Sequence, residues 1–177
     1  MTATTVDRPQ ARESQGRTSR ILAIAGILAM VVGFGSVLGG AFGAWYTHDQ
    51  AVAQNVVTPD DAAIAATPVR GPFTMWAQSD IIMHHQLEST GGLYYAEMDR
   101  TVPQLDETGA AVLDENGEAV MVPNEARASW LTATTLTTAL GLGIVSYALA
   151  AFAIMTGLTL IMAGYAFLHI RKRALIL

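Results

Sequence analysis

Four side chains between residues 80 and 88 are the strongest candidates for chemistry in this chain of 177 residues. Asp80, His84 and Glu88 are four residues apart, so on a helix they lie on one face, where an imidazole and two carboxylates can meet a cation. His85 points about 100° away from His84 on the same helix. A facial triad of two histidines and one carboxylate therefore cannot come from this helix alone, and His48 would have to supply the missing ligand.

The same residues fit a structural role, as the polar face of a helix with local ion pairs. We expect this role, with no catalytic residue and no metal site. The alternative is a metal-dependent exported enzyme or sensor that uses Asp80, His84, His85, Glu88 and His48. The sequence contains no cysteine, which excludes disulfides, covalent haem attachment and cysteine-held iron–sulfur clusters. Together with the structural role of the polar face, this leads us to expect that the chain carries no cofactor of its own and is not an enzyme.

Two long apolar segments indicate the class of protein. The first, Ile21 to Tyr46, has no charged residue, and the second, Leu131 to Ile170, has only His169 near its end. Each exceeds the roughly 20 apolar residues needed to cross a bilayer. Surface helices of a soluble domain would instead carry a polar stripe. The sequence predicts an all-α membrane protein with two transmembrane helices, at 21–46 and 131–170, the second with a Thr-rich outer extension.

Two other interpretations of these segments are less consistent with the sequence. Two short spans within 131–170 would need a turn, but no proline or polar turn interrupts residues 136–168. A cleaved signal peptide has a core of about 7 to 15 residues, which is shorter than the first segment. We therefore expect two retained spans.

The distribution of charge predicts the orientation. Seven of the ten Lys and Arg residues lie in the end segments 1–20 and 171–177, which the positive-inside rule places in the cytoplasm. The loop 47–130 contains thirteen acidic residues and three arginines, a net charge of −10, and is expected outside the cell. The predicted location is the plasma membrane, with two passes. Residues 1–20 are rich in Thr, Arg, Gln and Ser and are expected to be disordered on their own.

The external loop is expected to contain two short helices. Thr58 followed by Pro59 is typical of a helix start and predicts a helix at about 58–66. Thr74 can cap a second helix at about 74–89. An isolated helix of that length is unstable in water. The second helix must therefore lie against the membrane interface, the outer ends of the spans or another protein.

A small β-hairpin or meander is predicted at about 101–122. Asn116-Gly117 is a strong hairpin signal. The segments Asp106 to Val112 and Asp114 to Val120 resemble each other and predict two successive hairpins. So few strands are marginally stable without a covering surface.

Glycine recurs at every fourth residue in the first span, at Gly35, Gly39 and Gly43. Small residues at this spacing let helix backbones approach closely in lipid. The partner is either a helix of another subunit or this chain's own second span, which has small residues at Ala153, Gly157 and Gly164. Neither span contains Asp, Glu, Lys or Arg, so we do not expect the chain to form a channel, transporter or proton pump alone.

Two runs in the loop carry a resemblance to a known family: Gly71 to His85 (GPFTMWAQSDIIMHH) and Glu88 to Glu97 (ESTGGLYYAE). With one span on each side, they resemble the small two-span accessory subunits of the actinobacterial respiratory supercomplex, of the supercomplex association factor type. That assembly joins a cytochrome bc complex to a haem-copper cytochrome c oxidase. The resemblance covers the loop helix and the layout of the spans, and it does not cover the hairpin region.

The resemblance implies a non-catalytic structural subunit that stabilises or associates the two complexes, with haem and copper only in the partner subunits. Expected partners are membrane lipid and subunits of the cytochrome bc complex and cytochrome c oxidase, and nucleic acid is not expected. A transient oxidase assembly factor is a further alternative. The expected contact residues are Gly35, Gly39 and Gly43 in the membrane and Trp76, Asp80, His84 and Tyr94 outside.

Overall fold

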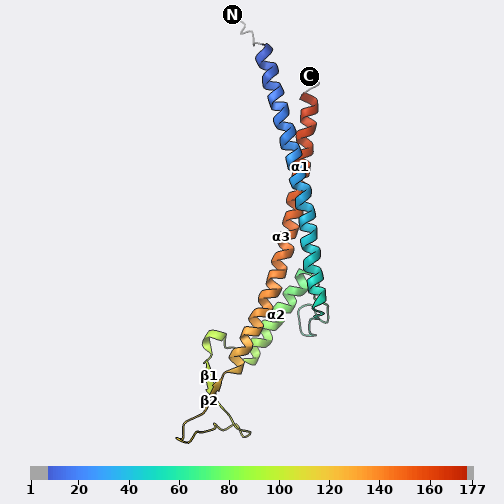
Figure 1. Ribbon diagram of the computed structural model, residues 1–177. Helices are drawn as coiled ribbons and strands as arrows, with labels where there is room; N and C mark the ends of the chain where they lie inside the picture. The colour runs from blue at the N-terminus through green and yellow to red at the C-terminus, as the bar shows by residue number, and fades with distance from the viewer. Residues whose placement is uncertain (1–7, 175–177) are drawn as a thin grey trace, which may run out of the picture. The chain divides into compact units, whose positions relative to one another are not determined.

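The computed structural model describes residues 8–174, and side chains from residue 15 to residue 173 (Figure 1). The outermost parts of the two predicted cytoplasmic tails, residues 1–7 and 175–177, lie outside the described residues. The chain divides into two compact units, residues 1–47 with 146–177, and residues 48–145.

Two long helices dominate the chain, as the sequence predicts. Helix α1 runs from Arg8 to Ala53 and helix α3 from Glu125 to Ala174, each without interruption. Both are long and apolar enough to cross a membrane. Most of their large apolar side chains are exposed, whereas a core helix of a soluble protein would bury them. The apolar segment 131–170 is one helix, because nothing in it breaks the backbone hydrogen bonding, and its Thr-rich start is helical.

The expected disorder of residues 1–20 is wrong for its described part, because residues 8–20 belong to α1. The apolar span already forms a helix, so these residues extend it without the cost of nucleating a new one. Pro9 suits the first turn, where its missing N–H has no partner to lose. At the end of the predicted N-terminal tail, Ser19 Oγ accepts a hydrogen bond from Arg171 Nε at 3.3 Å. Ser19 is buried there.

In the unit of residues 1–47 and 146–177, the two helices are antiparallel and touch through very small residues. A Cβ added to Gly33 would lie 2.7 Å from the carbonyl oxygen of Gly157, and one added to Gly157 would lie 2.5 Å from the carbonyl oxygen of Gly33. Only a hydrogen atom fits between such backbones. The buried residues of this seam recur every seven positions, which is the repeat of a left-handed helix pair. They are Gly26, Gly33 and Gly40 in α1 and Ala150, Gly157 and Gly164 in α3.

In the unit of residues 48–145, helix α2 (Pro72–Ser89) lies along the first turns of α3 (Figure 1). Gln86 Nε2 donates to Ser129 Oγ at 2.7 Å near one end of the contact. At the other end, Met75 Sδ lies 2.7 Å from the position of a Cβ on Gly143. The face of α2 that carries Met75 and Gln86 is therefore covered by the first part of α3. Ala77 and Ile81 are also buried, but by helix geometry they lie on a different side of α2.

Helix α2 begins two residues before the predicted start and ends where predicted. Gly71 is the N-cap and Pro72 is the first helical residue. Thr74 therefore sits inside the first turn, where its hydroxyl accepts the backbone N–H groups of Arg70 and Gly71 at 3.0 and 3.2 Å. The threonine does cap backbone donors, but from the third helical position rather than from the N-cap. At the other end, Gly91 adopts a left-handed conformation with φ +62°, typical of a helix stop.

The predicted helix at 58–66 is wrong, because these residues, all described, form a closed loop. Thr58 is only 2% exposed. Its hydroxyl donates to the carbonyl oxygen of Ile64 at 2.5 Å and accepts the N–H of Thr67 at 3.0 Å. Threonine can satisfy a helix start or bond to backbone across a loop with the same hydroxyl. In this structure the returning segment at Ile64 and Thr67 forms hydrogen bonds with that hydroxyl, so no helix starts at Thr58.

The predicted meander is confirmed as a two-stranded antiparallel sheet with two hairpins between its strands. Strand β1 is Thr101–Pro103 and strand β2 is Met121–Pro123. In the first hairpin Asp106 Oδ1 accepts two backbone N–H groups, at 2.9 and 3.0 Å, and in the second Asp114 Oδ1 does the same at 2.8 and 2.9 Å. Gly117 has φ +80°, so the Asn-Gly pair closes a turn that needs glycine at its last position.

The two hairpins and the strands are joined by a closed ring of three backbone hydrogen bonds. The N–H of Gln104 donates to the carbonyl of Val120 at 2.7 Å, that of Val120 donates to Val112 at 2.8 Å, and that of Val112 donates to Gln104 at 2.8 Å. These residues are eight positions apart, which is the length of the repeat seen in the sequence. The ring explains how such short hairpins hold together without a core.

A cluster of aromatic residues joins the segment after α2 to the start of α3. Trp130 is 3% exposed, and its indole N–H donates to the carbonyl oxygen of Leu93 at 3.1 Å. The ring of Tyr94 lies 5.4 Å from that of Trp130. Arg127 places its guanidinium 3.8 Å from the centre of the Tyr95 ring. This cluster fixes where the loop returns to α3.

Candidate functional site

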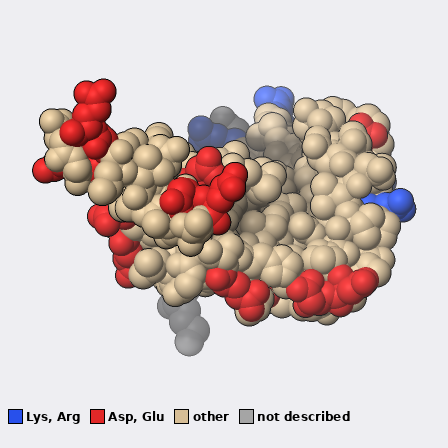
Figure 2. Space-filling model, turned by 90° about the horizontal axis from the view of Figure 1, so that it is seen from below, with Lys and Arg blue, Asp and Glu red and all other residues tan. Residues whose placement is uncertain are grey.

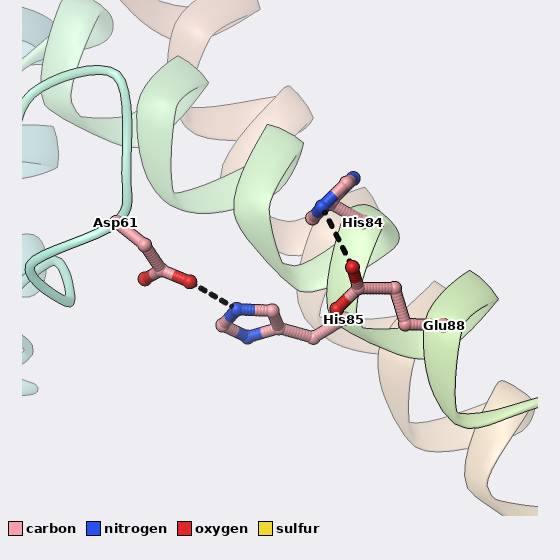
Figure 3. A network of polar contacts seen from close by, with 4 residues as sticks. All are labelled: Asp61, His84, His85 and Glu88. Carbon is pink, nitrogen blue, oxygen red and sulfur yellow. Dashed lines mark hydrogen bonds and ion pairs between the residues drawn. The ribbon is translucent and has the colours of Figure 1, made fainter.

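Three of the four candidate residues, His84, His85 and Glu88, take part in two separate pairs, and the fourth member of these pairs is Asp61 rather than Asp80 (Figure 3). His84 Nε2 lies 3.3 Å from Glu88 Oε1, the contact expected at this spacing on one helix face. His85 points elsewhere and places Nε2 2.6 Å from Asp61 Oδ2, on the loop between α1 and α2. All four side chains are well exposed, so each pair is screened by water and contributes little to stability.

The pair of His85 and Asp61 is the one that the sequence analysis missed. The hydrogen bond from His85 lowers the pKa of the Asp61 carboxyl below its ordinary value of 3.8. Twenty-four residues separate the two partners, so no helix periodicity connects them. Only the closed loop around Thr58, which was predicted as a helix, brings Asp61 to α2. The pair links that loop to the helix.

His48, the proposed fifth metal ligand, lies elsewhere. Its Nδ1 is 2.9 Å from the carbonyl oxygen of Arg70, just before α2. Within the described side chains, no group of three or more His, Asp and Glu residues could hold a metal ion. The set Asp80, His84, His85, Glu88 and His48 thus does not converge on one point.

The exposed face of α2 contains the predicted contact residues Trp76, Asp80 and His84. Trp76 is 53% exposed, and Asp80 and His84 are also exposed. The structure adds Phe73, which is 77% exposed at the first turn. Because Phe73 and Asp80 are seven residues apart, they share this face. Along the helix, the exposed face therefore changes from aromatic to charged.

Tyr94, the other predicted contact residue of the loop, has two roles available to it. One side of its ring packs against Trp130, yet the residue is still 52% exposed. The remaining surface can contact a partner, so its predicted role stays a prediction.

Gly35, Gly39 and Gly43 are not used in the contact between α1 and α3. A Cβ added at any of the three would meet no atom within 4 Å, apart from the helix's own nearby backbone. The chain's own packing uses the buried glycines of the seam instead, so of the two alternatives for these three residues, packing on the second span is wrong. The seven-residue spacing of Gly26, Gly33 and Gly40 was visible in the sequence, and it identifies the internal contact.

Two of these open glycines line a groove beside the seam, within the unit of residues 1–47 and 146–177. Its volume is about 350 Å³. Gly39 and Gly43 supply a surface without side chains, and larger residues border it. Such a surface lets the backbone of another helix come close. The groove residues are Gly39, Gly40, Gly43, Tyr46, Thr47, Ser146, Leu149, Ala150 and Ala153.

The acidic residues of the loop do not form one concentrated site on the face shown in Figure 2. Red carboxylate groups lie in several separate groups there, with few basic residues between them. Asp106 and Asp114 are engaged by backbone N–H groups of their own turns. Dispersed carboxylates of this kind keep a surface soluble and repel anions, without defining a single binding point.

Comparison of the chain with protein-family models, with curated protein sequences and with solved structures finds no match.

Proposed function

We propose that this chain is a non-catalytic structural subunit of a larger membrane assembly. By its resemblance in the loop and its two-span layout, that assembly is the respiratory one that joins a cytochrome bc complex to cytochrome c oxidase. The chain stabilises or associates the two complexes, and haem and copper belong to its partners.

The observation that supports this proposal best is the second glycine face of α1. The seam of Gly26, Gly33 and Gly40 is filled by α3, whereas Gly35 and Gly39 are exposed and Gly43 lies in an open groove. Helices in lipid associate mainly by close packing, so a helix with two small-residue faces has capacity for two neighbours. One neighbour lies within the chain, and a subunit of the assembly supplies the other.

The proposal includes two membrane spans, with both ends in the cytoplasm and residues 47–130 outside the cell. The exposure of large apolar side chains such as Leu38, Phe152 and Met162 supports it, since water would make such a surface unfavourable. The basic residues at both ends support the orientation.

The experiment is a pull-down in mild detergent on a tag placed after Leu177, with mass spectrometry and haem absorbance spectra of the eluate. The wild-type chain is expected to bring stoichiometric subunits of the cytochrome bc complex and the oxidase. Gly39→Leu places a side chain in the groove at a position where its Cβ meets no atom within 4 Å, and it is expected to lose these partners while the chain itself stays folded. Ala41→Leu is the matched control, because Ala41 is exposed in the same part of α1 and points about 200° away.

A haem-free eluate that contains only this chain would refute the respiratory assembly. Equal recovery of partners by the Gly39 and Ala41 variants would show that the groove is not the docking surface. Recovery of partners only from immature oxidase would favour a transient assembly factor over a resident subunit.

A further inference from the structure

Helix α2 carries exposed aromatic side chains in its first turns and charged side chains further along the same face. Phe73 and Trp76 are 77% and 53% exposed, although both side chains are large and apolar. Asp80, His84 and Glu88 continue the same face with charge toward the other end. A face that is aromatic at one end and charged at the other fits a boundary between lipid and water, where Trp and other aromatic residues gather.

The contacts of α2 indicate which end lies near the boundary. His48 Nδ1 contacts the carbonyl oxygen of Arg70 at 2.9 Å, immediately before α2, and Met75 lies against Gly143. The opposite end of α2, at Gln86, instead contacts Ser129, near the beginning of α3. The aromatic end of α2 is therefore next to His48, which follows the first apolar segment, and to Gly143, which lies in the second.

The lengths of those apolar segments give an estimate of the depth in the bilayer at which α2 begins. A helix rises about 40 Å from Ile21 to His48, and about 38 Å from Leu168 back to Gly143. A bilayer is about 40 to 45 Å thick with its headgroup layers. Both estimates place the start of α2 in the outer headgroup layer. Beside Gly143, Leu142 and Val145 are 63% and 52% exposed, so the apolar surface of α3 continues to this level.

We propose, on the basis of the membrane insertion in the proposed function, that the first two turns of α2 bind the outer lipid surface through Phe73 and Trp76. The remainder of α2 stands in water, with Asp80 about 10 Å further along the helix axis than Phe73. The occupant of this aromatic surface is the headgroup and upper acyl region of the surrounding lipid, rather than a protein.

The test uses single nitroxide labels, because the natural chain has no cysteine to remove. The variants Phe73→Cys, Asp80→Cys and Leu149→Cys are labelled, reconstituted as the full chain in phosphatidylcholine and phosphatidylglycerol vesicles, and measured by electron paramagnetic resonance. Oxygen, which concentrates in lipid, is compared with a water-soluble nickel chelate as relaxant. Asp80 is the matched control on the same helix face, and Leu149 reports the membrane span itself.

The expected ratio of oxygen to nickel accessibility is highest at residue 149, intermediate at 73 and severalfold lower at 80. A label at 73 that is as accessible to nickel as the label at 80, with residue 149 still in lipid, would overturn the lipid contact alone. A water-accessible label at 149 would overturn membrane insertion, and with it both proposals. Circular dichroism of each variant verifies that the helices are intact.

Discussion

At the scale of single residues, the glycines of α1 form two groups: those of the seam, which contact α3, and those of the open face, which do not. Gly33→Ala is expected to destabilise the chain by about 1–3 kcal/mol, because its Cβ would overlap backbone atoms of Gly157 and neither helix can yield without moving. Gly35→Ala is the control, since its Cβ meets open space. The measurement is the midpoint of thermal unfolding in mild detergent. Equal midpoints for the two variants would contradict the described seam.

A second prediction concerns the carboxyl of Asp61. His85→Ala is expected to raise the pKa of this carboxyl back toward 3.8, because the hydrogen bond from His85 is the largest cause of its lowering. The carbon-13 signal of the carboxyl, followed by nuclear magnetic resonance against pH, measures this directly. Asp106 serves as the internal control, since its pKa is lowered by the Thr108 hydroxyl and by backbone N–H groups and not by His85.

The sign of the pH dependence follows from the direction of this shift. Because the folded carboxyl has the lower pKa, the pair stabilises the closed loop above the ordinary pKa of 3.8. That contribution disappears as the pH falls through the lowered pKa. An Asp61 titration that is identical with and without His85 would show that the pair does not form in solution.

At the scale of elements, the ring of three hydrogen bonds makes the two hairpins dependent on each other. Asp114→Ala removes the two backbone contacts that close the second turn. Since Val120 also accepts the N–H of Gln104, the first hairpin is expected to loosen with the second. Amide hydrogen exchange at Gln104 should therefore become faster. Glu115→Ala removes the same charge from the same turn and is expected to leave this exchange unchanged.

If exchange in the Asp114 variant rises only between residues 113 and 120, the hairpins are independent and the ring of hydrogen bonds does not couple their stability. The contrast with the Glu115 variant separates loss of turn geometry from loss of charge. Both acidic residues are exposed, so neither substitution disturbs a core.

The elements also show what sequence alone can predict here. Both long helices, α2 and the hairpins follow from local patterns: uninterrupted apolar length, a capping threonine near the start of α2, and repeated Asp turns. The start of α2 was still predicted two residues late, at Thr74 instead of Pro72. The 58–66 segment was mispredicted because Thr58 bonds to Thr67 across a loop, and a local pattern cannot distinguish that from a cap. The candidate site was only partly predictable, because local patterns show pairs within one helix but not pairs between distant segments. His84 with Glu88 is a local pair, whereas Asp61 with His85 depends on tertiary structure.

At the scale of the whole molecule, the orientation is the property to test first. Glu107→Cys in the loop is expected to react with a membrane-impermeant maleimide added to intact cells. Lys172→Cys, at the basic end of α3, is expected to react only after the membrane is permeabilised. This difference follows from the positive-inside rule and the absence of charge within the spans. Labelling of both positions from outside would refute the two-span topology.

The glycine seam has a consequence for the biosynthesis of the chain. Its two halves are far apart in sequence, so α1 is synthesised well before α3 exists. At roughly 5 to 20 residues per second, translation from Gly33 to Gly157 takes on the order of ten seconds. For that period α1 presents glycine on two faces, one of which will later be covered by its own chain. A nascent chain that stalls before Ala150 therefore ends with a helix whose two glycine faces are both uncovered, which distinguishes it from the finished protein.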